Sequence, residues 1–345
     1  MNWIHWKSWL LIWLPVLCHV LDEFLPFGVI RGASFVAYIW MVMVFWVFSF
    51  TLALHGWNLT VRLVALVFVR ARRFALPARR RLQVTFVLIA VLGTSGFFAA
   101  ERVRVRTIRI PVPALSPALS PLRMVMVSDL HAGRTARRRV LLAARDAIRR
   151  AAPDLLVSTG DLLDATDGEA GMYLAFFRDI NPPLGKLAVT GNHEVYPGLA
   201  ASLEALESVG FEVIRNAVVS PVGGIEIGGV DDPAVADFGM ARPAEESVLA
   251  RFSPGTFRIL LKHRPELTAA ALASCDLQLS GHTHGGQVFP FGLLVRVFYP
   301  HPHARLIEFE SGLRLYVSNG AGTWGPPLRV LSPAEVTVFV LEHSP

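Results

Sequence analysis

Two long runs without a charged residue occupy 41 of the first hundred positions of this 345-residue chain. One extends from Ala33 to Leu54 and the other from Leu82 to Ala100, so each comes close to the roughly 20 apolar residues that a helix needs to cross a bilayer. Charged residues make up only 17% of the chain, compared with about 25% in an ordinary soluble protein, and the mean hydropathy is +0.46. The sequence therefore predicts that residues 1–101 form an α-helical transmembrane region.

A shorter apolar segment, Ser8 to Leu21, precedes these runs and contains Pro15 and His19. It is long enough to span only if the tryptophans and the lysine before it reach the membrane interface, and we predict a third span near residues 8–21. An interfacial helix and a secretory signal are the alternatives. The signal is disfavoured because no small-residue cleavage site is present and further apolar spans follow.

The arginines indicate how the spans are oriented. The loop between the two long runs is rich in arginine and should stay in the cytoplasm, because cytoplasmic loops are enriched in Lys and Arg. The chain would then leave its last span on the opposite side, which predicts a multi-pass protein of the cell (inner) membrane with an extracytoplasmic C-terminal domain. The arginines between positions 102 and 109 are a contrary signal. The arginines of the loop are Arg62, Arg70, Arg72, Arg73, Arg79, Arg80 and Arg81.

The remaining chain divides into a connector and a globular part. Residues 102–122 are basic and rich in proline, which breaks helices and favours extended backbone, so we expect a linker there. From residue 123 to 345, apolar runs rich in β-branched residues alternate with stretches of helical periodicity. Runs of this kind are typical of strands that are buried on both faces. The sequence therefore predicts an α/β domain over 123–345.

Five short polar segments of this domain each begin where an apolar run stops. In an α/β sheet the carboxyl ends of the strands usually hold the functional site. In extended backbone, residues two apart project to the same side, so we expect the pairs Asp129/His131 and His282/His284 each to point into one cavity. Carboxylate oxygen combined with imidazole nitrogen suits manganese, iron or zinc better than magnesium or calcium. The segments are Asp129-Leu130-His131, Gly160-Asp161, Gly191-Asn192-His193-Glu194, Lys262-His263 and Gly281-His282-Thr283-His284.

Together these segments contain a complete ligand set for two divalent metal ions. Asp161 is the natural bridge, since one carboxylate can hold two cations roughly 3.5–4 Å apart. Two divalent cations outweigh the two carboxylates and a bridging hydroxide, so the site should be net positive and attract phosphate. A bridging hydroxide would then attack phosphorus, and His193 would stabilise the equatorial oxygen or protonate the departing alkoxide. Glu194 either orients a histidine or is a surface carboxylate.

In order and type, these residues resemble the calcineurin-like metallophosphoesterase family over about residues 123–342. The segment after the last histidine, Gly285-Gly286-Gln287, and the Gly/Pro-rich stretch from Gly320 to Arg329 are similar to the membrane-associated, YkuE-like bacterial branch. The resemblance implies two central β-sheets flanked by helices, with His193 as the catalytic histidine. It implies one metal ion on Asp129, His131, Asp161 and His284, and a second on Asp161, Asn192, His263 and His282.

Several residues outside this set are weaker candidates for substrate binding. Arg134 lies close to the first ligands and Arg329 lies in the Gly/Pro-rich stretch, and either arginine would suit a phosphate group. Tyr299, His301 and His303 belong to a proline-containing loop that we expect to border the site and to take part in substrate selection.

The composition also narrows the partners. The net charge of +6 comes largely from arginines near the membrane, which favours contact with anionic membrane lipids. No basic motif with interleaved aromatic residues is evident in the catalytic part of the sequence, so nucleic acid is not an expected partner. The oligomeric state stays open.

The predicted function is therefore a membrane-anchored phosphoesterase acting on a phosphate ester or pyrophosphate, with a lipid-linked or envelope substrate. Among the alternatives, a pyrophosphatase for UDP-diacylglucosamine would work at the cytoplasmic face, which the predicted orientation opposes. A non-catalytic membrane scaffold that retains the fold is opposed by the filled ligand set. A transport or sensing protein is opposed by the lack of buried charged residues in the spans.

Overall fold

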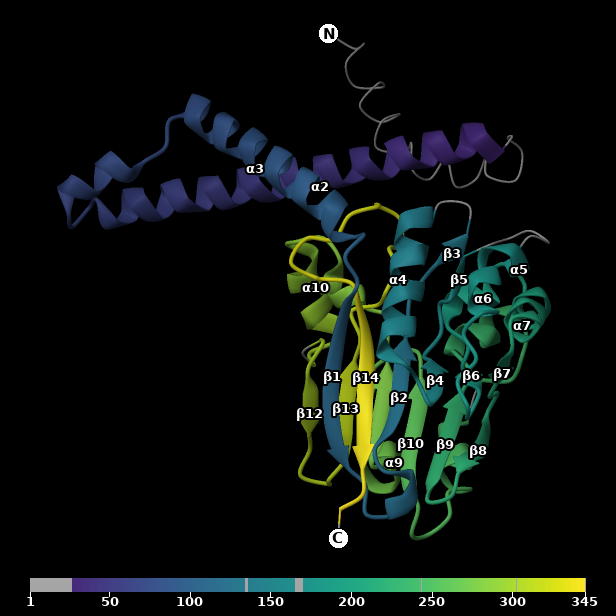
Figure 1. The fold of residues 1–345 in the computed structure, drawn as a ribbon. Coiled ribbons are helices and arrows are strands. Elements are labelled where there is room, and N and C mark those ends of the chain that lie inside the picture. The colour runs from purple at the N-terminus through teal and green to yellow at the C-terminus, as the bar shows by residue number, and fades with distance from the viewer. Residues whose placement is uncertain (1–26, 134–135, 165–169, 243, 302, 345) are drawn as a thin grey trace. The chain divides into compact units, whose positions relative to one another are not determined.

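The computed structural model describes residues 27–133, 136–164, 170–242, 244–301 and 303–344 (Figure 1). Its contacts divide the chain into two compact units. The first unit contains residues 27–98 together with Gly325–Val330, and the second contains Ala99–Trp324 and the chain from Leu331 onward. The predicted span near residues 8–21 lies outside the described residues.

The first unit is built on two long helices, α2 (Phe27–Val64) and α3 (Ala78–Ala99). Within the described part of the chain, these are the helices long and apolar enough to cross a membrane. They contain the two apolar runs from which the transmembrane region was predicted, so an N-terminal apolar helical region is confirmed. At 1.5 Å per residue, α2 would extend well beyond the roughly 30 Å of a hydrocarbon core.

The connection between α2 and α3 folds back onto the end of α2. The Asn58 side chain donates a hydrogen bond to the Leu76 carbonyl at 2.7 Å and accepts one from the Leu76 N–H at 2.8 Å. Trp57 donates its indole N–H to the Phe74 carbonyl at 3.1 Å. These side chains satisfy backbone groups at the end of the short 3-10 helix η2 (Val69–Phe74) and just after it, so the helical hairpin has a defined turn.

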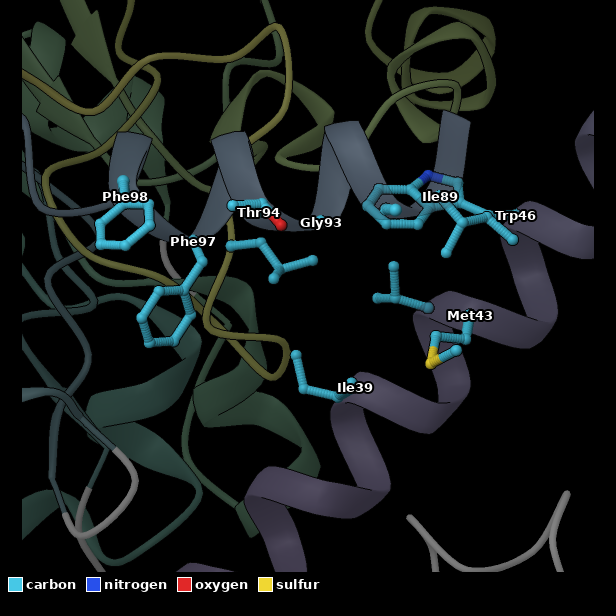
Figure 2. A pocket seen from close by; sticks show the side chains of 11 residues that line it. Ile39, Met43, Trp46, Ile89, Gly93, Thr94, Phe97 and Phe98 are labelled. Atoms are coloured by element: carbon cyan, nitrogen blue, oxygen red, sulfur yellow. The ribbon is translucent and has the colours of Figure 1, made fainter. Parts of the chain in front are cut away.

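Gly325–Val330 packs against this hairpin although it is far away in sequence. The Arg329 N–H donates to the Gly96 carbonyl at 3.0 Å, and a Cβ atom at Gly96 would lie 2.6 Å from Val330, so only glycine allows this approach. Leu328 and both helices line an apolar pocket of about 370 Å³ (Figure 2). Its walls include Trp46, Ile89 and Phe97.

The second unit contains two six-stranded mixed sheets and one two-stranded sheet. In the first sheet, β2, β4, β6 and β7 run parallel, whereas β14 and β1 run in the opposite direction. In the second sheet, β9, β10, β11 and β13 are parallel and the two edge strands are antiparallel to them. The first sheet has the order β1 (Arg104–Pro111), β14 (Glu335–Glu342), β2 (Leu122–Val127), β4 (Leu155–Ser158), β6 (Lys186–Ala188) and β7 (Phe211–Val213). The second has the order β12 (Leu306–Glu308), β13 (Arg314–Val317), β11 (Leu277–Ser280), β10 (Phe257–Lys262), β9 (Ile225–Val230) and β8 (Ala217–Val222); β3 (Ala132–Gly133) pairs with β5 (Leu163–Asp164).

Helices cover the outer face of each sheet. Along β2, Met124 and Met126 face a core shared with the second sheet, while Val125 and Val127 face helices, as the two-residue period of a strand requires. Helices α4 (Arg138–Ala151) and α7 (Leu199–Ser208) pack on the first sheet, and α8 (Glu245–Leu249) and α9 (Ala269–Ser274) on the second. This arrangement of helix, sheet, sheet and helix confirms the predicted fold class. The other short helices are α5 (Ala170–Tyr173), α6 (Asn192–Val195), α10 (Phe291–Phe298), η3 (Pro117–Leu119), η4 (Ala175–Phe177), η5 (Pro233–Phe238) and η6 (His284–Gly286).

The structure differs from the predicted boundaries at two places. The segment expected to be a linker, residues 102–122, contains strand β1, which pairs in parallel with β14 along its whole length. The proline content signalled extended backbone correctly, but a single sequence does not show that this extended segment has a sheet edge to join. Helix α10 was not predicted either, because its apolar residues lie in a glycine- and proline-containing region.

Candidate metal centre

The polar segments gather at one edge of the two sheets. Asp129 follows β2, Asp161 follows β4, His263 follows β10, and the segment from His282 to His284 follows β11. Backbone hydrogen bonds tie these loops together: the Asp129 N–H donates to Gly160 at 3.1 Å and the Gly281 N–H donates to His263 at 2.9 Å. The carboxyl ends of parallel strands from both sheets thus converge on a single site.

The backbone of this site is strained. Residues other than glycine rarely adopt a positive φ, and each such residue costs on the order of 1–3 kcal/mol unless the surroundings impose it. We expected extended backbone for the pairs Asp129/His131 and His282/His284, and this expectation is wrong because the strands end before them. The left-handed residues are Asp129 (φ 51°), His131 (49°), Asp161 (54°), His282 (70°) and His284 (49°).

Two glycines are required by space rather than by their own conformation. A Cβ atom at Gly191 would lie 2.1 Å from Asp161 Oδ1, and one at Gly281 would lie 2.3 Å from Asp129 Oδ2. Both distances are far shorter than any van der Waals contact. The two carboxylates are therefore held directly against backbone of the neighbouring loops.

The side chains form two groups that can each hold a metal ion. In each group the potential ligand atoms lie within 4.8 Å of one another. His131 Nε2 lies 3.0 Å from His284 Nε2, and His284 Nε2 lies 3.6 Å from Asp129 Oδ1. In the other group, His263 Nε2 lies 3.0 Å from Asp161 Oδ2 and 3.2 Å from His282 Nδ1. The two histidines of the His282-Thr283-His284 segment thus belong to different groups.

Asp161 connects the groups. Its Oδ2 atom also lies 3.8 Å from His131 Nε2, and His131, Asp161 and His193 form a third set of converging ligand atoms. Its Oδ1 atom accepts a hydrogen bond from the His193 backbone N–H at 2.9 Å. This position between the two groups is the one that a bridging carboxylate requires.

Hydrogen bonds outside the groups orient the rings. His263 Nδ1 lies 2.8 Å from the Thr159 carbonyl, which can only accept a hydrogen bond, so Nδ1 carries a proton and Nε2 is the ring atom turned toward Asp161 and His282. A backbone carbonyl behind a ligating histidine is a common feature of metal sites.

The side chain of Asn192 also indicates a metal site. Its Oδ1 atom is buried and has no hydrogen-bond partner among the described residues. A buried amide oxygen without a partner is costly, since most buried polar atoms are satisfied. Its neighbour His193 takes part in the third set of ligand atoms, so a cation on the Asp161 side is the partner that the Asn192 oxygen fits.

Burial and charge determine the protonation of the histidines. Burial lowers the pKa of His131 to about 4 and that of His282 to about 3, so both are neutral and able to ligate at neutral pH. Burial also disfavours the charged form of His263, but the charge of Asp161 and its hydrogen bond raise the pKa of His263 to about 10. The negative potential that holds a proton there also attracts a metal cation.

His193 has a different surrounding from the other histidines. Its Nδ1 atom lies 3.0 Å from Asp164 Oδ1. Burial alone would lower the pKa of His193, but the hydrogen bond to Asp164 and the charges of Asp161 and Asp164 raise it to about 9. A protonated imidazole held by a carboxylate at the edge of the site is arranged to donate a proton. The pairing of Asp164 with His193 is visible only in the fold, because no local pattern in the sequence links the two residues.

Replacing Asp164 by Asn should reduce turnover while leaving the bound metal in place. The amide cannot stabilise a protonated His193, and loss of such an orienting carboxylate typically reduces activity by about 10–100-fold. We expect this reduction in kcat, with unchanged metal content by plasma mass spectrometry. Asp179→Asn, an exposed carboxylate outside the site, is the matched control. Metal loss in the Asp164 variant would contradict a purely positioning role.

Glu194 holds the loops rather than a histidine. Its side chain is fully buried and accepts four backbone hydrogen bonds, from Gly191 (2.7 Å), Asp161 (2.8 Å), Leu162 (2.8 Å) and Leu163 (3.1 Å). Both interpretations from sequence are therefore wrong. Burial and the charge of Asp161 raise the pKa of Glu194 to about 7, against the effect of these donors.

Replacing Glu194 by Gln should destabilise the domain. The amide brings two N–H groups to face backbone N–H donors, so buried donors lose their acceptor, at a cost of about 1–3 kcal/mol. We expect a decrease in melting temperature of about 2–4 °C per kcal/mol, measured by differential scanning fluorimetry. Glu204→Gln, on the exposed face of α7, should leave the melting temperature unchanged. Equal stability of the two variants would contradict this role.

The predicted substrate-binding arginines are not part of this site as described. Arg134 lies outside the described residues. Arg329 is buried in the unit that contains the apolar helices, so its contact with substrate stays a prediction.

Aromatic residues border the site, and sequence reasoning identified only part of them. The ring of Tyr299 lies 5.6 Å from that of His282, and His303 Nδ1 lies 3.0 Å from Thr283 Oγ1, so the loop containing both residues does flank the site. Tyr196 and Trp324, which lie 5.4 and 5.8 Å from the His193 ring, had not been identified as neighbours of the site. Both are about half exposed and line the approach to His193.

Comparisons with known proteins agree with this geometry. A family model described as calcineurin-like phosphoesterase matches residues 122–286. An uncharacterized metallophosphoesterase of Aquifex aeolicus is 34% identical over 256 residues, which cover 74% of this chain and 98% of that protein. The uncharacterized metallophosphoesterase YkuE of Bacillus subtilis is 36% identical over 210 residues, or 57% of this chain and 71% of YkuE. A transmembrane protein with metallophosphoesterase domain from Danio rerio is 31% identical over 279 residues, or 77% of this chain and 63% of that protein.

Proposed function

Since this chain belongs to the calcineurin-like phosphoesterase family of hydrolases, we propose that it is a membrane-anchored enzyme that uses two divalent metal ions to cleave phosphate ester or pyrophosphate bonds. The observation that carries the proposal is the pair of Asp/His groups joined by Asp161. No arrangement of purely structural side chains needs four histidines and two aspartates whose lone pairs converge within a few ångströms.

The residues present fit two metal ions. Such ions, when bound, act as Lewis acids and lower the pKa of a water molecule to about 7, which supplies a nucleophile at neutral pH. Mixed nitrogen and oxygen donors favour manganese, with iron or zinc as alternatives. Asp129, His131, Asp161 and His284 would hold one ion, and Asp161, Asn192, His263 and His282 the other.

His193 would act on the leaving group. Its Nδ1–H donates to Asp164, which leaves Nε2 as the ring nitrogen available to a substrate. A protonated Nε2 donates a hydrogen bond to a phosphoryl oxygen and then gives its proton to the departing alkoxide. Tyr196 and Trp324 pack against the ring and keep it in this orientation.

The membrane helices suggest where the substrate is found. An enzyme confined to a bilayer meets lipid-linked and envelope phosphates at high local concentration, so we propose a substrate of this kind. The arginines between α2 and α3 favour a cytoplasmic loop and hence an extracytoplasmic catalytic domain. A pyrophosphatase acting on UDP-diacylglucosamine at the cytoplasmic face is the second candidate, and a scaffold without activity is the third.

A substrate panel tests the proposed function most directly. The full chain in detergent with added manganese should hydrolyse at least one of a nucleotide-linked glycolipid, a phospholipid and bis-p-nitrophenyl phosphate. The ranking of the three separates the lipid-linked from the general phosphodiester alternative. A protein with two bound metal ions that hydrolyses none of them, while Asp161→Asn still binds metal, would support the scaffold.

The orientation can be tested on its own. We expect alkaline phosphatase fused to the C-terminus to be active, because this reporter folds only outside the cytoplasm, and green fluorescent protein at the same position to be dark. Reporters placed in the loop between α2 and α3 should show the opposite pattern. A fluorescent C-terminal fusion would place the catalytic domain in the cytoplasm and favour the cytoplasmic pyrophosphatase.

A further inference from the structure

Helix α10 exposes apolar side chains although it belongs to the phosphoesterase domain. Leu293, Leu294, Val297 and Phe298 are 58%, 52%, 75% and 78% exposed, and no residue of the helix is buried. Scattered apolar residues are normal on a surface, but neighbouring exposed apolar residues on one short helix mark an interaction site.

The helix lies beside the metal centre. It begins five residues after the end of η6, which starts at His284, and its last turn leads into Tyr299, whose ring packs on His282. At its N-terminal side, Gln287 accepts a hydrogen bond from the Trp324 N–H at 2.9 Å, and Trp324 in turn borders His193. Both ends of α10 are therefore connected to residues that line the site.

The phosphoesterase domain begins at the edge of its sheets that carries the metal centre. Arg104, the first residue of β1, pairs with Glu335, and the Glu335 N–H donates to Gly320 at 3.0 Å. The adjoining loop bonds to the site, since the Gly322 N–H donates to the Asp129 carbonyl at 2.9 Å. The chain therefore enters the domain from α3 at the edge that carries the metal centre, and Figure 1 shows α10 at the end of the domain where β1 begins.

We propose that α10 inserts its apolar side chains into the surface of the lipid bilayer and so presents the metal centre to phospholipid headgroups. This rests on the proposed membrane anchoring and deepens the proposed function, since it names a phosphate group at the membrane surface as the substrate position. A lipid surface is favoured over a protein partner because the covalent link to the apolar helices enters at the same edge. The charge of this region also favours a lipid surface. Exposed Arg296 lies within the helix and exposed Arg305 follows it, and both can bind anionic lipid headgroups.

A fluorescent probe on the helix tests this in the full chain. Leu294→Cys is labelled with a nitrobenzoxadiazole dye in a Cys18→Ser background and reconstituted into vesicles of phosphatidylethanolamine and phosphatidylglycerol. Cys275 is buried, and burial raises its pKa to about 12, so it should not react. The control label is at Glu310→Cys, in the exposed turn that precedes β13 at the opposite end of the sheet.

We expect the label at position 294 to emit further to the blue than the label at 310 and to be quenched by doxyl-labelled lipid. Quenching should be strongest for doxyl groups near the headgroup, since interfacial helices lie only about 5–10 Å deep. Introducing Val297→Glu into the labelled protein should reduce this quenching at least twofold, because a carboxylate on this face opposes insertion.

Two outcomes would overturn the proposal. One is quenching of the label at 294 by aqueous iodide to the same extent as the label at 310. The other is a blue-shifted label that doxyl lipid does not quench, because a protein, such as a second copy of this chain, would then cover the helix. Hydrolysis of bis-p-nitrophenyl phosphate by the same sample reports on the metal centre separately. Lipid quenching without hydrolysis would support α10 docking and contradict the proposed enzyme.

Discussion

Replacing Asp161 by Asn is expected to abolish metal binding and hydrolysis together. Asp161 Oδ2 lies 3.0 Å from His263 Nε2 and 3.8 Å from His131 Nε2, so both ligand groups share one carboxylate. An amide removes the negative charge and turns an N–H donor toward one of the groups. Bound metal ions would contribute several kcal/mol to transition-state stabilisation, and about 4 kcal/mol corresponds to a ~10³-fold loss of kcat/KM.

The measurement combines metal content with kinetics. Wild-type protein should contain two ions per chain, and the Asp161 variant fewer than one. Asp146→Asn, which removes an exposed carboxylate from α4, should match the wild type in both quantities. An Asp161→Asn protein that keeps both ions would show that the carboxylate does not bridge them.

Replacing His193 by Ala is expected to lower kcat without changing the metal content. The hydrogen bond from this residue to Asp161 comes from the backbone N–H, so the alanine variant keeps it and should keep both ions. Loss of a positioned general acid reduces turnover by about 10²–10⁴-fold. Metal content should therefore equal that of the wild type while kcat falls.

The leaving group provides a sharper test of the same variant. If His193 protonates the departing oxygen, its loss should matter most for alkyl esters, whose alkoxides leave poorly, and least for p-nitrophenyl esters. His343→Ala, a histidine that bonds to the Leu115 carbonyl elsewhere in the domain, is the control. A loss of turnover that is independent of the leaving group would indicate transition-state charge stabilisation rather than proton donation.

Much of the candidate site could be predicted from sequence because its pieces are local. A polar residue directly after a buried apolar run identifies a strand end, and strand ends of an α/β sheet lie together without further information. Asp129, Asp161 and His263 were found in this way. Arg134 and Arg329 had no such support, since an arginine in a loop is compatible with many environments.

Contacts between distant segments could not be predicted. Asp164 pairs with His193 across 29 positions of sequence, and Glu194 reaches back to the backbone at Asp161. Both carboxylates look like ordinary loop residues in the sequence, because no local pattern distinguishes an acceptor of backbone hydrogen bonds from a solvated side chain. Strand β1 was not predicted because its partner β14 lies at the other end of the chain.

The sequence by itself determined the two apolar helices, the α/β alternation and the ligand types, since each depends on composition or period within one segment. Only the tertiary structure decided how the ligands are shared. It bends the backbone at Asp129 and Asp161 into the left-handed region and sends His282 and His284 to different groups. It also leaves α10 exposed beside the site. These features depend on how loops from two sheets meet, and packing between elements imposes them against the local preference of the chain.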